Sequence, residues 1–318
     1  MHARLTLPNS TNVRNAMSLA FTRLQVSVAS ALAPSRAVVK AQRLFLTPPR
    51  HEHTAREREV LATGQGFTVT STFARLAAWR FGAADRPAVV VSHGWGGRGA
   101  QFRQFVPKLV EAGYQVIAFD HAAHGYSEGD EASLVHFIRD LEAVVADLDA
   151  KGVAVAGIVG HSLGAAAIGA WLKRSGRANL RVVLIAPPSS VERYSGYFAR
   201  FVGLPERLRR EMQQRVEGRF GMAWRDFELP GSVEGIAAPA LVIHDGGDRE
   251  VAFSSGLAIA RAWKDARLVR TEGLGHRAIL RDPDVVRDTI DFLRDEVRFA
   301  TPPGSGEKSE FSVPAPLI

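Results

Sequence analysis

Short runs of apolar, often β-branched residues alternate with longer segments of helical spacing from Phe67 onward. This alternation is typical of βαβ units, in which helices connect the strands of a sheet. The pattern predicts strands over residues 67–73, 76–81, 88–92, 115–119, 155–159, 182–186, 240–244 and 267–271. The first two strands predict a hairpin, and the other six are separated by connections of helical length.

Helical spacing is clearest over residues 134–148, where apolar side chains recur every three or four positions. Ser133 directly precedes this stripe and is the predicted N-cap. Two further helices are predicted over residues 102–110 and 286–297. We expect the apolar stripe of the first helix to pack against the sheet.

Two regions lack the alternation. Residues 189–235 carry no strand signal but have apolar residues at steps of four, which predicts a helical insertion. The core is therefore expected in residues 61–188 and 236–300. Residues 1–60 are predicted to form a basic, helical N-terminal arm, and residues 301–318, rich in Pro, Gly and Ser, a disordered tail.

Composition limits the chemistry that the chain can perform. It has 318 residues, is 46% hydrophobic and contains no cysteine, which excludes disulfides, thiolate metal sites and a cysteine nucleophile. Its apolar runs fall short of the ~18 residues that a membrane-spanning helix needs. Residues 1–50 hold seven bases and no acid, so they carry the whole net charge of +7. The balanced remainder argues against nucleic-acid binding.

A candidate nucleophile follows the predicted strand 155–159. The pentapeptide GHSLG at residues 160–164 has the form G-x-S-x-G and precedes a run of alanines that begins a predicted helix. A serine at a sharp strand-to-helix turn adopts strained dihedral angles, and the flanking glycines leave room where the chain doubles back. Ser162 is thus the predicted nucleophile, and an ordinary glycine-rich turn is the alternative.

A serine nucleophile needs a histidine base and a carboxylate that orients the base. The loop DGGDREV after strand 240–244 carries Asp248, and the loop EGLGH after strand 267–271 ends at His276. Both loops follow the carboxyl ends of strands, where open α/β sheets collect their active residues. Asp245 is close enough in the sequence to compete with Asp248 for the role of the acid.

Acyl transfer also needs two hydrogen-bond donors for the oxyanion. The segment HGWGG at residues 93–97 directly follows strand 88–92, so its backbone can face the nucleophile. The amides of Trp95 and Leu163 are the predicted pair of donors. The alternative is that this segment is only a flexible loop.

Together these motifs resemble the α/β-hydrolase superfamily, in its serine-hydrolase branch. HGWGG, GHSLG, DGGDREV and GLGH occur in the order and spacing of that family, over about residues 67–297. The resemblance implies the α/β-hydrolase fold, with a mostly parallel eight-stranded sheet flanked by helices and a cap made by the insertion. It also implies a triad of Ser162, Asp248 and His276.

Two details of the motifs qualify the resemblance. The segment DHAAHGYS at residues 120–127 is similar to the family's D-x-x-G-H-G-x-S loop, with Ala123 where glycine is usual. Ser162, in place of an aspartate, argues against haloalkane dehalogenases and epoxide hydrolases.

The expected activity is hydrolysis of a small carboxylic ester or thioester through an acyl-enzyme intermediate, with no cofactor and no metal. An acyltransferase or a perhydrolase can use the same residues, and a ligand-binding or receptor protein with negligible turnover can share the fold. The short-spaced histidines form no recognisable set of metal ligands; these are His51, His53, His121 and His124.

The apolar residues of the insertion have two interpretations. They can pack the insertion onto the body of the protein, or they can line a pocket for the acyl group. Phe198, Phe201, Leu208 and Met212 are the candidates for the lining.

Residues 1–50 leave three interpretations open. Apolar residues at helical spacing between Val13 and Val28 favour a helical arm docked on the hydrolase body, in a cytoplasmic protein. The excess of bases is compatible with contact to an anionic membrane surface. The stretch 17–21 and the tripeptide ALA at residues 31–33 resemble a secretory signal, although Arg23 and Gln25 interrupt its apolar core.

Overall fold

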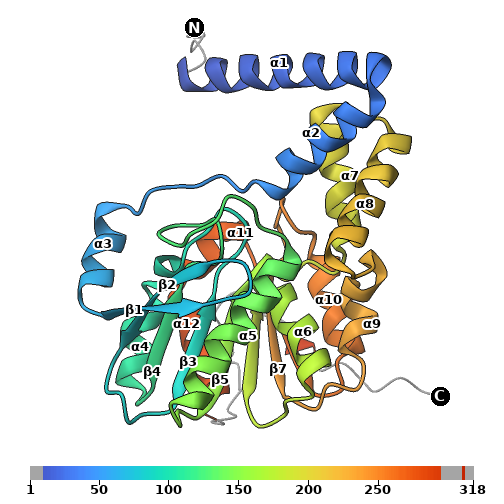
Figure 1. The fold of residues 1–318 in the computed structure, drawn as a ribbon. Coiled ribbons are helices and arrows are strands. Elements are labelled where there is room, and N and C mark those ends of the chain that lie inside the picture. Colours follow the sequence, from blue (N-terminus) through green and yellow to red (C-terminus); the bar gives the residue numbers. More distant parts are fainter. Residues whose placement is uncertain (1–9, 295–309, 312–318) are drawn as a thin grey trace, which may run out of the picture. The chain divides into compact units, whose positions relative to one another are not determined.

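The computed structural model describes residues 10–294 and 310–311, and the chain divides into two compact units (Figure 1). One unit, called the helical unit below, consists of Met1–Leu46 and Val191–Arg225. The other, called the sheet unit, consists of Thr47–Ser190 and Asp226–Ile318. The helical unit therefore combines the N-terminal arm with most of the predicted insertion.

One sheet forms the centre of the sheet unit. Its strands are β1 Gln65–Thr70, β2 Arg75–Phe81, β3 Ala88–Ser92, β4 Gln115–Phe119, β5 Val155–His161, β6 Arg181–Ile185, β7 Ala240–Asp245, β8 Ala266–Thr271 and β9 Glu310–Phe311. They lie in the order β1-β2-β4-β3-β5-β6-β7-β8-β9. Neighbours between β4 and β8 are parallel, whereas β1, β2 and β9 pair antiparallel. The predicted mostly parallel sheet of eight strands is confirmed, and β9 extends it at one edge.

The burial of the central strands explains why the sequence predicted their ends closely. β3, β4 and β7 are buried along their whole length. A strand buried on both faces reads as a continuous apolar run, so its ends are visible in the sequence. No predicted strand end lies more than three residues from the observed one. Most of the predicted tail 301–318 lies outside the described residues; only Glu310–Phe311 is described, as β9.

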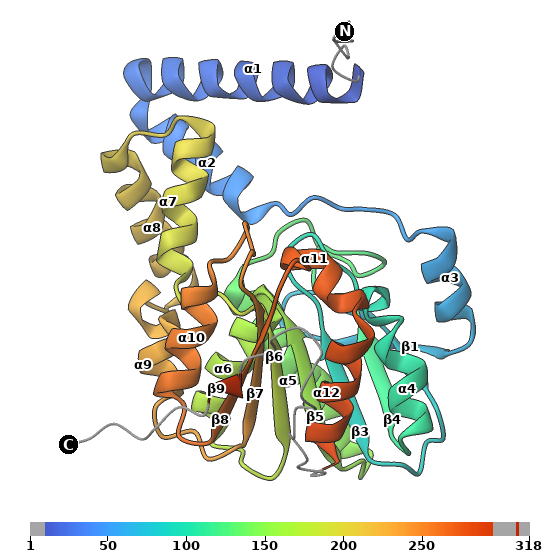
Figure 2. The same cartoon turned by 180° about the vertical axis from the view of Figure 1, so that it is seen from behind.

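Helices cover both faces of the sheet (Figures 1 and 2). On one face α4 and α12 pack on the strands around a buried cluster that includes Phe105, Leu109, Val286 and Leu293. On the opposite face α5 and α6 pack against each other and against β5. The helices of the sheet unit are α3 Ala55–Ala62, α4 Phe105–Glu111, α5 Leu134–Ala150, α6 Leu163–Ser175, α9 Leu229–Val233, α10 Phe253–Ala262, α11 Gly275–Ala278 and α12 Pro283–Leu293, with 3-10 turns η1 Gly99–Phe102 and η3 Ile279–Arg281.

A local capping signal fixes the start of helix α5. Ser133 is the N-cap of α5, where its side chain accepts a hydrogen bond from the His136 amide.

Ala123, the residue that replaces the glycine usual in the resembled loop, has φ 63° and donates its amide to the Glu128 carbonyl at 2.8 Å. The loop therefore keeps a left-handed backbone here without a glycine, at a strain of about 1–2 kcal/mol.

The helical unit consists of two pairs of helices. The arm supplies α1 Ser10–Leu32 and α2 Pro34–Leu46, and the insertion supplies α7 Val191–Val202 and α8 Glu206–Phe220. A 3-10 turn, η2 Trp224–Phe227, follows at the boundary of the units. A cluster of buried apolar residues forms the core of this unit; its members are Val26, Ala37, Val38, Ala41, Ala199, Val202, Leu204, Leu208 and Met212. Among the described residues, no helix combines the length and apolarity that crossing a bilayer requires.

The N-terminal arm packs on helices of the insertion. Helix α1 packs against α7, and α2 packs against both α7 and α8. An apolar stripe on a helix shows that one face needs a partner but does not identify the partner, so the sequence did not predict this packing. Docking of the arm on the hydrolase body stays a prediction. The arm was expected to extend to residue 60, but the chain enters the sheet unit at Thr47.

Candidate active site

The predicted nucleophile occupies a sharp turn between β5 and α6. Ser162 has φ 53° and ψ −120°, a left-handed conformation that is costly for any residue except glycine. Two close approaches explain the glycines beside it. A Cβ on Gly160 would lie 2.5 Å from Ile168 Cδ1, and a Cβ on Gly164 would lie 2.4 Å from the carbonyl oxygen of His93. The turn therefore depends on glycine at both flanking positions.

His276 and Asp248 meet at the carboxyl end of the sheet. The Nδ1 atom of His276 lies 2.7 Å from Oδ2 of Asp248, and both side chains are buried. A carboxylate can only accept, so Nδ1 carries the hydrogen and donates it. In the neutral ring this tautomer leaves the lone pair on His276 Nε2, which is the form that a base requires.

Asp248 receives further hydrogen bonds that stabilise its charged form. Its Oδ1 accepts the amides of Glu250 at 2.8 Å and Val251 at 2.9 Å. His244 Nε2 donates to the Val251 carbonyl at 2.9 Å and lies 3.5 Å from Asp248 Oδ2. Burial alone would raise the pKa of Asp248, but hydrogen bonds from His244, His276 and the Val251 amide outweigh burial and hold that pKa well below its usual range.

Asp245, the competing carboxylate, bonds to other groups. Its oxygens accept the Gly247 amide at 3.0 Å, the Thr271 hydroxyl at 3.0 Å and the Leu274 amide at 3.0 Å. These bonds connect the ends of β7 and β8 and the loop that leads to His276. The structure therefore pairs His276 with Asp248, while Asp245 supports the loop.

His161 connects the serine turn with the loop of His276. Its Nε2 donates to the backbone carbonyl of His276 at 2.8 Å, and the two imidazole rings lie 4.7 Å apart. Ser162 follows His161 directly in the chain, so this bond fixes the distance between the two candidate residues.

The segment 93–97, called the glycine loop below, lies directly against Ser162. A Cβ on Gly94 would lie 2.8 Å from Ser162 Cβ. Gly97 donates its amide to the Gly94 carbonyl at 2.9 Å, which closes a tight turn around Trp95. Leu163 is the first residue of α6, and the first amides of a helix have no partner within it. The two predicted oxyanion donors thus belong to backbone segments that meet at Ser162.

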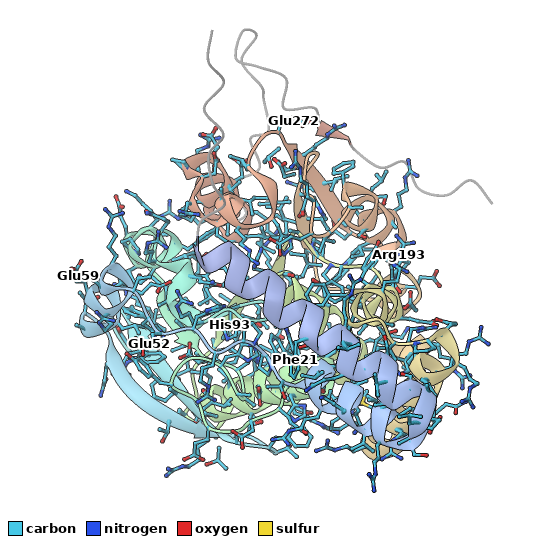
Figure 3. The ribbon with its side chains drawn as sticks, turned by 90° about the horizontal axis from the view of Figure 1, so that it is seen from above. Phe21, Glu52, Glu59, His93, Arg193 and Glu272 are labelled. Carbon is cyan, nitrogen blue, oxygen red and sulfur yellow. The ribbon has the colours of Figure 1, made fainter. Side chains whose placement is uncertain are left out.

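His93 joins the glycine loop to the next loop, residues 120–127. Its Nδ1 donates to the Gly94 carbonyl at 2.7 Å, and its Nε2 accepts the His121 amide at 3.0 Å. The ring is fully buried, and burial holds the pKa of His93 well below its usual value. His93, labelled in Figure 3, is therefore a neutral ring that both donates and accepts.

His124 makes the opposite connection. From the loop 120–127, its Nδ1 donates to the Ala122 carbonyl at 2.8 Å, and its Nε2 accepts the Gly96 amide at 3.0 Å. Burial lowers the pKa of His124 to about 4. Each loop therefore contributes a histidine that accepts a hydrogen bond from a backbone amide of the other loop. Trp95 lies between Gly94 and Gly96, which both bond to these histidines, so the bonds hold the backbone on either side of its amide.

Reasoning from the sequence missed the supporting roles of these histidines. His161 and His124 stand inside motifs that the sequence identified, and His244 stands at the end of a predicted strand. Each of these rings bonds a backbone group: His161 and His124 bond groups of distant loops, and His244 bonds the Val251 carbonyl of the loop that follows its own strand. Only their position in or beside the motifs could have indicated a role.

The four candidate pocket residues of the insertion lie in the helical unit and differ in exposure. Leu208 and Met212 are buried in the core of that unit, and Phe198 packs against it. Phe201 is 57% exposed. Leu208 and Met212 pack against residues of the N-terminal arm within the helical unit. Packing of the insertion onto the body and lining of an acyl pocket both stay predictions.

Burial of His161 predicts a measurable dependence of stability on pH. Burial lowers the pKa of His161 to about 3, against 6.5 for an unperturbed histidine. The unfolded chain therefore binds a proton that the folded chain does not, and stability is lost as the pH falls below 6.5. We expect His161→Gln, whose amide can still donate to the His276 carbonyl, to reduce this loss by up to ~1.4 kcal/mol per pH unit.

Urea unfolding of both proteins between pH 7 and pH 5 measures this difference. An equal slope of unfolding free energy against pH in the two proteins would show that His161 is not held neutral by the fold.

A family model described as Serine aminopeptidase, S33 matches residues 83–227. The non-heme chloroperoxidase CPO-A1 of Kitasatospora aureofaciens is 35% identical over 107 residues, which are 32% of this chain and 38% of the relative. The pyrethroid hydrolase of Sphingobium wenxiniae is 35% identical over 115 residues, 33% of this chain and 39% of the relative. The chain thus spans about two fifths of the length of these curated relatives.

Solved structures extend the likeness over most of the chain. The Pyrococcus furiosus esterase Pf2001 has a TM-score of 0.60 and 22% identity, and the match covers 78% of this chain and 98% of the esterase. The likeness to this esterase and the strand order of the sheet unit both agree with the α/β-hydrolase fold that the motifs implied. The sheet unit therefore has the α/β-hydrolase fold, and the chain is similar to hydrolases of that fold.

Proposed function

We propose that the protein is a serine hydrolase that cleaves a small carboxylic ester or thioester through an acyl-enzyme intermediate. The observation that carries the proposal is the 2.7 Å bond between His276 Nδ1 and Asp248 Oδ2, beside a serine held at a strained turn. A buried, charged carboxylate on Nδ1 leaves Nε2 free to accept a proton. The likeness to named hydrolases supports the same class of reaction.

The first half of the proposed reaction acylates Ser162. Its Oγ attacks the substrate carbonyl carbon, and His276 Nε2 takes the hydroxyl proton. The amides of Trp95 and Leu163 donate to the oxyanion that forms. When the carbon–oxygen or carbon–sulfur bond breaks, His276 returns the proton to the leaving alcohol or thiol.

The second half releases the acid product. Water attacks the acyl carbon while His276 Nε2 accepts one of its protons, and collapse of the intermediate passes that proton to Ser162 Oγ. Asp248 stays ionised throughout, since it stabilises the protonated imidazole without accepting the proton. The chemistry requires neither a cofactor nor a metal ion.

A second candidate is transfer of the acyl group to an acceptor other than water, such as an alcohol or hydrogen peroxide. The same residues permit it, because only the attacking molecule in the second half changes. The likeness to a non-heme chloroperoxidase favours keeping this candidate. Comparing acid release with acyl transfer in the presence of each acceptor distinguishes the two.

Ser162→Ala tests the nucleophile. We expect the variant to lose hydrolysis of p-nitrophenyl esters and labelling by a fluorophosphonate probe, because no other group can form the acyl-enzyme. Its melting temperature should change little, since only one small hydroxyl is removed. Probe labelling that survives in the folded variant would refute the assignment.

Asp248→Asn and Asp245→Asn form a matched pair that tests the acid. We expect Asp248→Asn to lower kcat/KM by roughly 10⁴, because an amide cannot stabilise the imidazolium or hold its tautomer. Asp245→Asn should keep most of the rate per folded molecule, since its partners belong to the loop. The reverse order of the two rates would assign the acid to Asp245.

His124 is proposed as a positioning residue for the oxyanion donors. We expect His124→Leu to lower kcat by about 10–100-fold with little change in KM, because Gly96 loses its acceptor and the Trp95 amide its alignment. His124→Gln can supply an acceptor near the same position and should restore most of kcat. A change confined to KM, or no recovery in His124→Gln, would contradict this role.

A further inference from the structure

Exposed apolar side chains are concentrated in the helical unit. Among the described residues, 11 large hydrophobic side chains are exposed, and nine of them belong to this unit. The other two, Phe73 and Tyr126, are the contribution of the much larger sheet unit. Scattered exposed hydrophobic residues are normal, but a concentration of them marks a surface that has a partner.

Helix α1 arranges four of these side chains in one stripe. Phe21, Leu24, Val28 and Leu32 follow each other at steps of three or four residues, and they are 62%, 62%, 48% and 81% exposed. Such steps place them on one face of the helix. Figure 3 shows Phe21 on this helix.

The stripe lies opposite the face with which α1 packs in its own unit. Val26 is fully buried in the core of the helical unit. It stands two residues from both Leu24 and Val28, which is about 200° around the helix from each. The exposed stripe and the buried face are therefore on opposite sides of α1. Burial of the stripe from solvent requires a second partner.

Charge identifies the chemistry of that partner. The helical unit contains 14 basic and four acidic residues, a net charge of +10, whereas the sheet unit contains 26 basic and 29 acidic residues. Helices α1 and α2 contain no acidic residue. On α7, Arg200 lies 4.8 Å from the ring of Tyr197, so that bases and exposed aromatic side chains adjoin.

We propose that the helical unit binds an anionic lipid surface through the stripe of α1. The apolar side chains of the stripe enter the boundary of the acyl chains, and the excess of bases in the helical unit attracts the lipid phosphates. A second copy of this unit would place two surfaces of net charge +10 against each other, and their repulsion opposes association. A nucleic acid would supply phosphates but no apolar phase for Leu24, Val28 and Leu32. This inference does not depend on the proposed catalytic function.

Cosedimentation of the full-length protein with vesicles tests the proposal. We expect binding to vesicles of mixed phosphatidylglycerol and phosphatidylcholine at low salt, weaker binding at high salt, and at least tenfold weaker binding to phosphatidylcholine alone. The double variant Phe21→Gln/Leu24→Gln, which keeps good helix formers at both positions, should bind the mixed vesicles at least tenfold more weakly than the unaltered chain.

Phe73→Gln is the matched control, because it removes an exposed aromatic side chain from the sheet unit. It should bind mixed vesicles like the unaltered chain. The double variant and the control should both keep the melting temperature and the rate of p-nitrophenyl ester hydrolysis measured without vesicles, whatever that rate is.

Three results would overturn the proposal. One is that the unaltered chain does not bind the mixed vesicles, or that the double variant binds them equally well. Another is sedimentation velocity showing a dimer that the double variant abolishes, without vesicle binding, which assigns the stripe to a second copy. The third is that the unaltered chain does not bind vesicles and the double variant melts several degrees lower, which assigns the stripe to packing within the chain.

Discussion

The positive φ of Ser162 is the constraint on which the candidate site depends. A left-handed serine costs about 1–3 kcal/mol and persists only when its surroundings leave no alternative. Here Gly160 and Gly164 let α6 and the end of β3 approach to distances that no side chain would allow. The Ser162 amide donates to the Ile185 carbonyl of β6 at 2.9 Å, which holds the turn from the other side. The strain of one residue is thus maintained by three parallel strands and a helix.

Neutral histidines suit the support of such a turn because one ring can donate at one nitrogen and accept at the other. A lysine or arginine can only donate, and a carboxylate can only accept. Burial keeps these rings neutral: it holds the pKa of His93 and His161 far below the usual value. The cost is sensitivity to acid, since protonation of a buried ring removes an acceptor and introduces an unpaired charge. The same property that lets His93 join two loops therefore limits the pH range of the fold.

The sequence predicted those features whose cause is local. The elbow could be found because its steric requirement is visible as Gly160 and Gly164, and the strands because continuous burial leaves continuous apolar runs. The choice between Asp245 and Asp248 was not local. Asp245 ends β7 and Asp248 follows three residues later, and their roles are distinguished by bonds to distant groups: Asp245 accepts the Thr271 hydroxyl and the Leu274 amide, whereas Asp248 accepts the bond from His276. The bonds of His93, His124 and His161 could not be predicted for the same reason, since each of these rings bonds a backbone group of another loop.

The helical unit was the least predictable part, and its size explains part of its surface. A unit of 81 residues has little interior, so a number of apolar side chains must stay exposed. Lack of space alone would scatter them over all four helices. On α1 they instead form a stripe opposite Val26, and a helix with apolar residues on two opposite faces needs two partners. Helices α2 and α7 supply the partner of one face within the unit. The excess of bases and the absence of acids on α1 and α2 then favour an anionic surface as the partner of the other.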